Sequence, residues 1–131
     1  MTGTIITQEG QKIMLNRTFK SVPDYTAPTE FKVGTGTTNP TITDTDLETP
    51  VGIDGDNFKG VVAGYPVLDE SNLQATIRCL LLSTEANGND LTEFGLVNTD
   101  ASRKLFSRAV HGAITKNNST QIIYVEKDKF I

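Results

Sequence analysis

The segment Leu73-Gln74-Ala75-Thr76-Ile77-Arg78-Cys79-Leu80-Leu81-Leu82 decides the fold class of this chain. Its odd-numbered positions are apolar from Leu73 to Leu81, and its even-numbered positions are polar until Leu80. A repeat of two is typical of a β-strand that buries one face, because successive side chains point to opposite sides of a strand. An amphipathic helix repeats its apolar residues about every 3.6 positions, which explains this set less well. We therefore predict a β-strand over residues 73–82.

Further strand-like segments lie on either side of this one: residues 30–33, stopped by Gly34, residues 92–97, residues 104–110, stopped by Gly112, and residues 120–131. Asn87-Gly88 predicts a hairpin between strands 73–82 and 92–97. The polar residues 116–119 predict a second hairpin that leads into the terminal strand. Because parallel sheets need helical crossovers that this sequence lacks, we predict an all-β (mainly β) fold, an antiparallel β-sandwich or small barrel.

Two segments do not follow the strand pattern. Residues 34–57 are so rich in turn-forming residues that we predict one long Thr/Gly-rich loop, with a short helical turn around residues 43–48. Residues 11–19 mix apolar and polar side chains, which indicates a short helix or an irregular arm. The chain is thus predicted to divide into an N-terminal arm or short helix, residues 1–28, and a single β-sandwich domain, residues 29–131.

Charge and hydropathy argue against two classes of partner. With 131 residues, a net charge of −4 and a pI near 4.9, the chain has no overall positive field that would attract nucleic acid or an anionic membrane. Its longest apolar run, Cys79–Leu82, has four residues, whereas a membrane span needs ~20. The N-terminus lacks the basic and apolar regions of a secretory signal. We expect no nucleic-acid partner, no membrane partner and no export.

The chain offers little material for catalysis. It has one His and one Cys, whereas zinc sites and disulfides need several such residues. The sequence contains no motif that would give His111 a catalytic partner, so we expect a hydrogen-bonded structural histidine. Cys79 is expected to pack in the core. We therefore expect no catalytic, cofactor-binding or metal-binding residues, no cofactor and no enzymatic activity.

The predicted loop contains two weaker patterns. Gly34-Thr35-Gly36 is a glycine-rich turn, but it lacks the Gly-Lys-Ser/Thr ending of a phosphate-binding loop. Asp44, Asp46 and Glu48 supply oxygen ligands without the order of a calcium-binding EF-hand. We interpret these acidic residues as a solvated loop, with an incidental ion as the alternative.

One resemblance covers about residues 30 to 131. It is carried by Phe31–Pro40, Thr43–Leu47, Leu91–Val97, Lys104–Val110, Ile114–Lys116 and the closing Ile/Tyr/Val strand. This order of motifs resembles small structural proteins of tailed bacteriophages. The resemblance implies a β-sandwich virion component of the tail, baseplate or fibre region, made in the host cytoplasm, with no catalytic residues to transfer. An additional stretch, Val51–Glu70, separates the two matching halves.

We therefore expect this chain to function by assembling with other proteins. Its partners would be other virion structural proteins and further copies of itself, in a trimer or hexamer with cyclic symmetry. We predict the subunit interface at apolar residues of the N-terminal arm that have no obvious core of their own: Ile13, Met14, Leu15 and Phe19.

Other functions compete with this one. Within the virion, the alternatives are a capsid decoration (cement) protein and a head-to-tail connector. From another class, a carbohydrate-binding β-sandwich would need exposed aromatic rings, and the chain has no Trp and three Tyr, at positions 25, 65 and 124.

Overall fold

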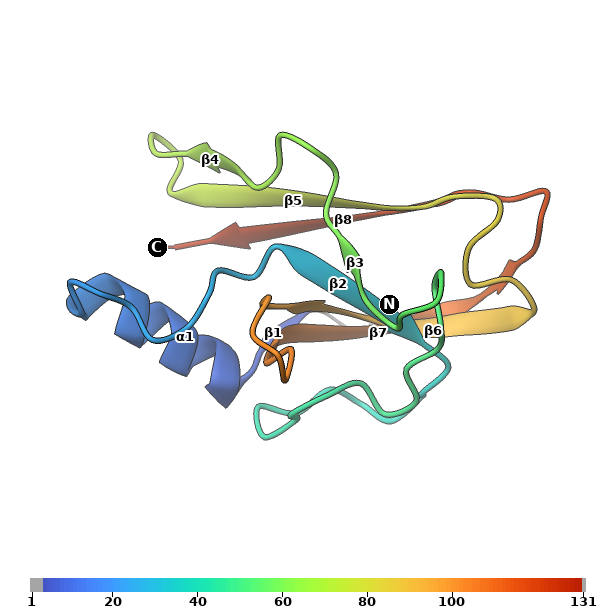
Figure 1. Ribbon diagram of the computed structural model, residues 1–131, viewed down its shortest axis with the longest axis horizontal. Helices are drawn as coiled ribbons and strands as arrows, with labels where there is room; N and C mark the ends of the chain where they lie inside the picture. Colours follow the sequence, from blue (N-terminus) through green and yellow to red (C-terminus); the bar gives the residue numbers. More distant parts are fainter. Residues whose placement is uncertain (1–3, 131) are drawn as a thin grey trace.

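The computed structural model describes residues 4–130 as two packed antiparallel sheets with one helix at their end (Figure 1). The elements are β1 (Ile5–Ile6), α1 (Gln8–Phe19), β2 (Glu30–Gly34), β3 (Lys59–Gly60), β4 (Val67–Asp69), β5 (Gln74–Leu81), β6 (Asn89–Val97), β7 (Leu105–Lys116) and β8 (Ile122–Lys129). The large sheet has the strand order β1-β7-β6-β2-β3, and the small sheet has the order β4-β5-β8. The predicted mainly-β, sandwich-like fold is confirmed.

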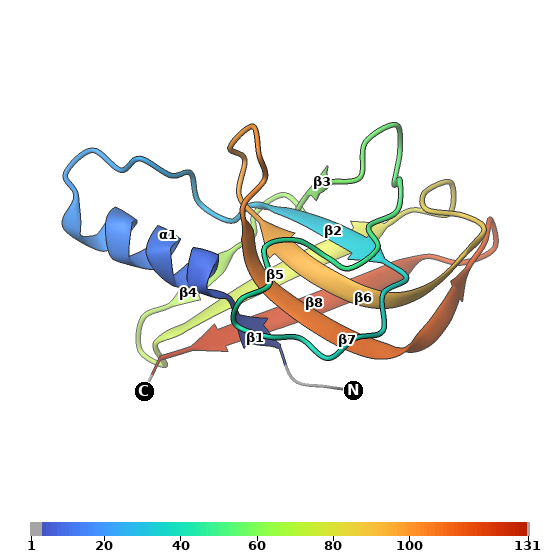
Figure 2. The same cartoon turned by 90° about the horizontal axis from the view of Figure 1, so that it is seen from below.

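The core lies between the two sheets, which Figure 2 shows one in front of the other. Phe31 and Leu91 come from the large sheet, and Ile77, Leu81 and Ile122 come from the small one, and all belong to one buried cluster. Across the layers, the rings of Phe94 and Tyr124 stack with their centroids 4.5 Å apart. Cys79 is also fully buried there, as predicted.

Strand β5 confirms the alternation seen in the sequence, but its predicted hairpin partner is wrong. Strand β5 pairs with β4 and β8, whereas β6 pairs with β2 and β7 in the other sheet. A two-residue type I′ hairpin needs positive φ at both central residues, and of Asn87 and Gly88 only Gly88 has it. The Gly88 N–H donates to the carbonyl of Lys116 (2.9 Å), the last residue of β7 in the large sheet. The turn therefore carries the chain from the small sheet into the large one.

The second predicted hairpin is also wrong, because its two strands lie in different sheets. Residues 117–120 do form a tight turn, in which the Thr120 N–H donates to the Asn117 carbonyl (3.2 Å). Strand β8 then pairs with β5 rather than with β7. Gly112 does not end β7 either, because the strand continues to Lys116 past a register shift opposite Leu91 and Glu93.

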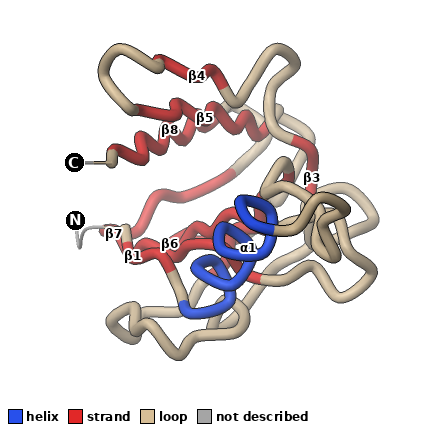
Figure 3. The backbone as a smooth tube through the Cα atoms, turned by 90° about the vertical axis from the view of Figure 1, so that its left-hand side faces the viewer, coloured by secondary structure: helices blue, strands red, loops and turns tan. Residues whose placement is uncertain are grey.

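The N-terminal segment forms a helix that packs on the sandwich rather than an uncovered arm. Thr7 caps α1 by accepting a hydrogen bond from the Gly10 N–H (3.0 Å), and β1 pairs with β7. Ile13 faces the core and is only 1% exposed. Figure 3 shows α1 at one end of the sandwich, in front of the large sheet.

The long loop predicted over residues 34–57 corresponds to residues 35–58 between β2 and β3, and the helical turn expected around 43–48 is absent. The loop returns beside its starting strand, where Gly34 and Pro50 form an isolated β-bridge.

Candidate functional site

A buried carboxylate holds the long loop in place. Glu93 lies on β6 and is fully buried. It accepts hydrogen bonds from three loop amides, those of Gly36 (2.7 Å), Glu48 (2.9 Å) and Thr49 (2.8 Å). A buried carboxylate is stable only when such donors or a cation replace its lost hydration. Glu93 therefore fixes both ends of the loop at once.

The two glycines of Gly34-Thr35-Gly36 make room for this carboxylate. A Cβ atom on Gly36 would lie 2.4 Å from Glu93 Oε2, and one on Gly34 would lie 2.5 Å from the same oxygen. Side chains at these positions would therefore displace Glu93. The amide of Gly36 in this glycine-rich turn donates to an internal carboxylate, as the amides of phosphate-binding loops donate to phosphate.

Arg108, on β7, completes this polar centre. Its side chain is buried, and its Nε donates to Glu93 (2.9 Å) while Nη1 donates to Asp44 (3.1 Å). The remaining nitrogen, Nη2, has no hydrogen-bond partner among the residues that the structure describes. Burial by itself would raise the pKa of Asp44, but hydrogen bonds from Thr41 and Arg108 outweigh it and hold that pKa below its usual value.

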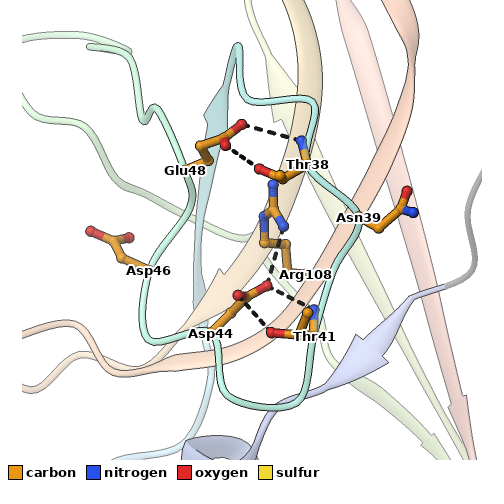
Figure 4. A pocket seen from close by; sticks show the side chains of 7 residues that line it. All are labelled: Thr38, Asn39, Thr41, Asp44, Asp46, Glu48 and Arg108. Carbon is orange, nitrogen blue, oxygen red and sulfur yellow. Dashed lines mark hydrogen bonds and ion pairs between the residues drawn. The ribbon is translucent and has the colours of Figure 1, made fainter.

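Arg108 forms part of a loop pocket of about 310 Å³ (Figure 4). Its other lining residues are Thr38, Asn39, Thr41, Asp44, Asp46 and Glu48. The acidic residues already have partners: Glu48 accepts from the amides of Thr37 and Thr38, and Asp46 pairs with Lys32 (3.0 Å). Within residues 4–130, no group of three or more His, Cys, Asp or Glu side chains is placed to hold a metal ion. The pocket is thus the surface of an internal ion-pair network.

A second buried acid lies between the sheets. Glu126, on β8, accepts hydrogen bonds from the Ser107 hydroxyl of β7 (2.9 and 3.1 Å). Burial, and then the neighbouring carboxylate of Asp128, raise the pKa of Glu126 to about 9. The raised pKa favours the protonated form of Glu126 in the folded chain. Sequence reasoning missed this residue, although Glu126 shares the inward parity of Ile122 and Tyr124 on its strand.

The isolated histidine and cysteine have structural surroundings. His111 shares a hydrogen bond with the Tyr124 hydroxyl (2.8 Å), as expected of a hydrogen-bonded histidine. Burial raises the pKa of the Cys79 thiol well above its usual value, which keeps the reactive thiolate form scarce. Tyr124 lies between Phe94 and His111, so its ring is not available as a sugar-stacking surface.

The four predicted interface residues are divided between core and surface. Ile13 is buried and Met14 packs against the core, so the premise that they lack a core is wrong for both. Leu15 and Phe19 are 63% and 80% exposed, on the outer side of α1. With Lys12, Asn16, Lys20 and Tyr25 they line a surface hollow of about 350 Å³. Only these two of the four remain candidates for an intersubunit contact.

A second exposed apolar surface lies on the small sheet and was not predicted. Ile123 and Val125 point outward from β8 and are 49% and 55% exposed. On the same outer face, Leu80 of β5 lies opposite Ile123. Strand β8 is also the last strand of its sheet.

No family model matches the chain, and neither a curated protein nor a solved structure matches it. Within the described residues, no helix is both long and apolar enough to cross a membrane.

Proposed function

We propose that this chain is a non-enzymatic structural subunit of a tailed-bacteriophage virion, in the tail, baseplate or fibre-attachment region. It is made in the host cytoplasm and works by binding other virion proteins and further copies of itself. The placement of its large apolar side chains carries the proposal, because several of them lie on the surface instead of in the core.

Two surfaces contribute these side chains. One is the outer side of α1 with Leu15 and Phe19, and the other is the outer face of β8 with Ile123 and Val125. Single exposed apolar residues are ordinary, but grouped ones next to the free edge of a strand are typical of protein contact sites. Assembly would bury both surfaces.

The virion assignment rests on the resemblance of the sequence motifs. The positions of these motifs in the fold support treating them as one set. Phe31–Pro40 covers most of β2 and the start of the loop, Leu91–Val97 lies in β6, and Lys104–Val110 begins one residue before β7 and covers its first half. Because β7, β6 and β2 are neighbours in the large sheet, the motifs form one continuous and largely buried part of that sheet, next to the loop that Glu93 holds. The additional stretch Val51–Glu70 supplies β3 and β4 at sheet edges.

The polar centre supports a structural role. Its ionised groups bind one another: Arg108 pairs with Glu93 and Asp44, and Glu93 also holds three loop amides. A catalytic acid or base needs a free position beside its substrate, whereas the carboxylates of Glu93 and Asp44 form their hydrogen bonds with the protein itself.

The proposal is tested on phage particles that encode this chain. We expect mass spectrometry to find the chain in purified particles, and an antibody raised against it to label the tail or its tip in electron micrographs. Labelling of the capsid surface or the neck would instead assign the decoration or connector role. Absence from purified particles would overturn the virion assignment, and turnover in a broad hydrolysis screen would overturn the non-enzymatic one.

A further inference from the structure

We infer that the free edge of β8 pairs antiparallel with β8 of a second copy of this chain, about a two-fold axis at Tyr124. This inference rests on the proposed assembly function and specifies one of its contacts. It joins two small sheets into one continuous sheet across the dimer.

The unpaired backbone groups of β8 can be assigned from its hydrogen bonding. The Phe130 N–H, just after β8, donates to the Leu73 carbonyl (2.9 Å). In an antiparallel pair, every second residue directs its N–H and C=O to the same neighbour. The register between β5 and β8 is unbroken from Gln74↔Lys129 to Leu81↔Ile122. The even-numbered residues therefore bond β5, and the N–H and C=O groups of Ile123, Val125, Lys127 and Lys129 point to the free edge.

The side chains along this edge differ between its two halves. Lys127 and Lys129 are exposed at its C-terminal half, where charge protects an edge strand from unwanted pairing. Ile123 and Val125 in the N-terminal half are exposed and uncharged, so this half has no such protection. The unprotected stretch is short and one-sided, which selects a single partner strand in a defined register.

The charges select the register centred on Tyr124. There Ile123 lies opposite Val125 of the second copy, and each such pair exchanges two backbone hydrogen bonds. Lys127 then lies opposite the neutral Gln121 of the second copy. A register centred on Val125 would place Lys127 opposite Ile123, and one centred on Glu126 would place the two Glu126 side chains opposite each other. Only the register on Tyr124 brings Ile123 and Val125 of both copies together. It also keeps Lys127 and Lys129 away from like charges and from these apolar residues.

The shape of the contact sets the stoichiometry. A two-fold contact of this kind uses the same surface on both copies and closes as a dimer. A hexamer then needs a second contact, for which the exposed Leu15 and Phe19 on α1 are available. A trimer without two-fold axes does not use this edge in the way inferred.

Amide hydrogen exchange of the unmodified chain tests the register directly. We expect the amides of Ile123 and Val125 to exchange at least about tenfold more slowly as the protein concentration is raised about a hundredfold. The amides of Ile122 and Tyr124 serve as internal controls, because they bond β5 with or without a second copy. Fast exchange at Ile123 and Val125 at every concentration would overturn the inference, as expected if the edge instead accepts a strand from a different virion protein.

A matched pair of variants tests the contact by mass. We expect light scattering to show a concentration-dependent dimer or hexamer for the natural chain, and loss of the two-fold contact in Val125→Lys. Val67→Lys is the control, because Val67 is 47% exposed on β4 at the opposite edge of the same sheet. Equal masses for the two variants would overturn β8 pairing. If the chain is nevertheless found in phage particles, that failure leaves the proposed function in place.

Discussion

At the scale of single residues, Glu93 explains why the loop contains glycine where it does. We predict that Gly36→Ala lowers the free energy of unfolding by about 2 kcal/mol, because its Cβ would collide with the Glu93 carboxylate and with the Glu48 side chain. Urea denaturation measures the change. Gly52→Ala is the control, since no atom beyond Gly52 and its two chain neighbours lies within 4 Å of the position its Cβ would take. Equal stability of the two variants would contradict the role assigned to Gly36.

Glu126 makes the stability depend on pH. Its pKa rises from an ordinary 4.5 to about 9 in the folded chain. The folded state therefore keeps a proton that the unfolded state has lost, so the contribution of Glu126 is intact below pH 4.5 and is lost as the pH rises towards about 9. We predict that Glu126→Gln, which mimics the protonated acid, raises stability by about 2 kcal/mol at pH 8.

The same variant should flatten the fall in stability across this range, measured by urea denaturation at a series of pH values. Glu70→Gln is the control, because Glu70 is exposed. A Glu126→Gln variant that remained as pH-sensitive as the natural chain would show that Glu126 is ionised in the folded state.

The sequence predicted residues whose roles follow from local pattern, and missed those whose roles depend on distant segments. Cys79 was placed in the core because it belongs to an alternating strand. Glu93 lies on the face of β6 opposite to the core residues Phe94 and Leu96, past a register shift after Leu91, and its burial requires amides that come from residues 36, 48 and 49. Nothing within a short window of sequence reveals that those amides converge on it.

At the scale of elements, the strands could be predicted and their partners could not. The alternation in residues 73–82 reports which side chains share a face, and this does not depend on the neighbouring strand. A polar turn such as Asn87-Gly88 reports only that the chain reverses. Reversal within one sheet and reversal between two stacked sheets use similar residues, so both hairpin predictions placed consecutive strands in the same sheet.

Helix α1 separates a core contact from a surface contact within three residues. We predict that Ile13→Ala lowers the free energy of unfolding by about 3 kcal/mol, because it empties a buried site. Leu15→Ala should change it by less than about 0.5 kcal/mol, because Leu15 is exposed. Thermal or urea denaturation compares the two variants. A comparable loss for both would mean that the outer side of α1 is covered within the monomer, which would remove Leu15 from the interface.

At the scale of the whole molecule, the two sheets are joined by chain connections and by side chains. The chain passes between the sheets three times, from β3 to β4, from β5 to β6 and from β7 to β8. Ser107 and Glu126, and then His111 and Tyr124, form hydrogen bonds between β7 and β8 across the layers. Neither sheet can leave the other without exposing a shared core and breaking these contacts.

We therefore predict that the monomer unfolds in a single transition. Far-ultraviolet circular dichroism follows both sheets, and tyrosine fluorescence includes the partly buried Tyr124. Both should give the same urea midpoint, because the two layers share one large buried cluster and lose it together. The variant Val125→Lys keeps subunit dissociation from adding a second step. Separate midpoints, with the amides of β5 and β8 exchanging before those of β6 and β7, would instead make the small sheet an independently opening layer. Its free edge would then reach a partner strand by local unfolding, rather than as the rigid surface that pairing in one register requires.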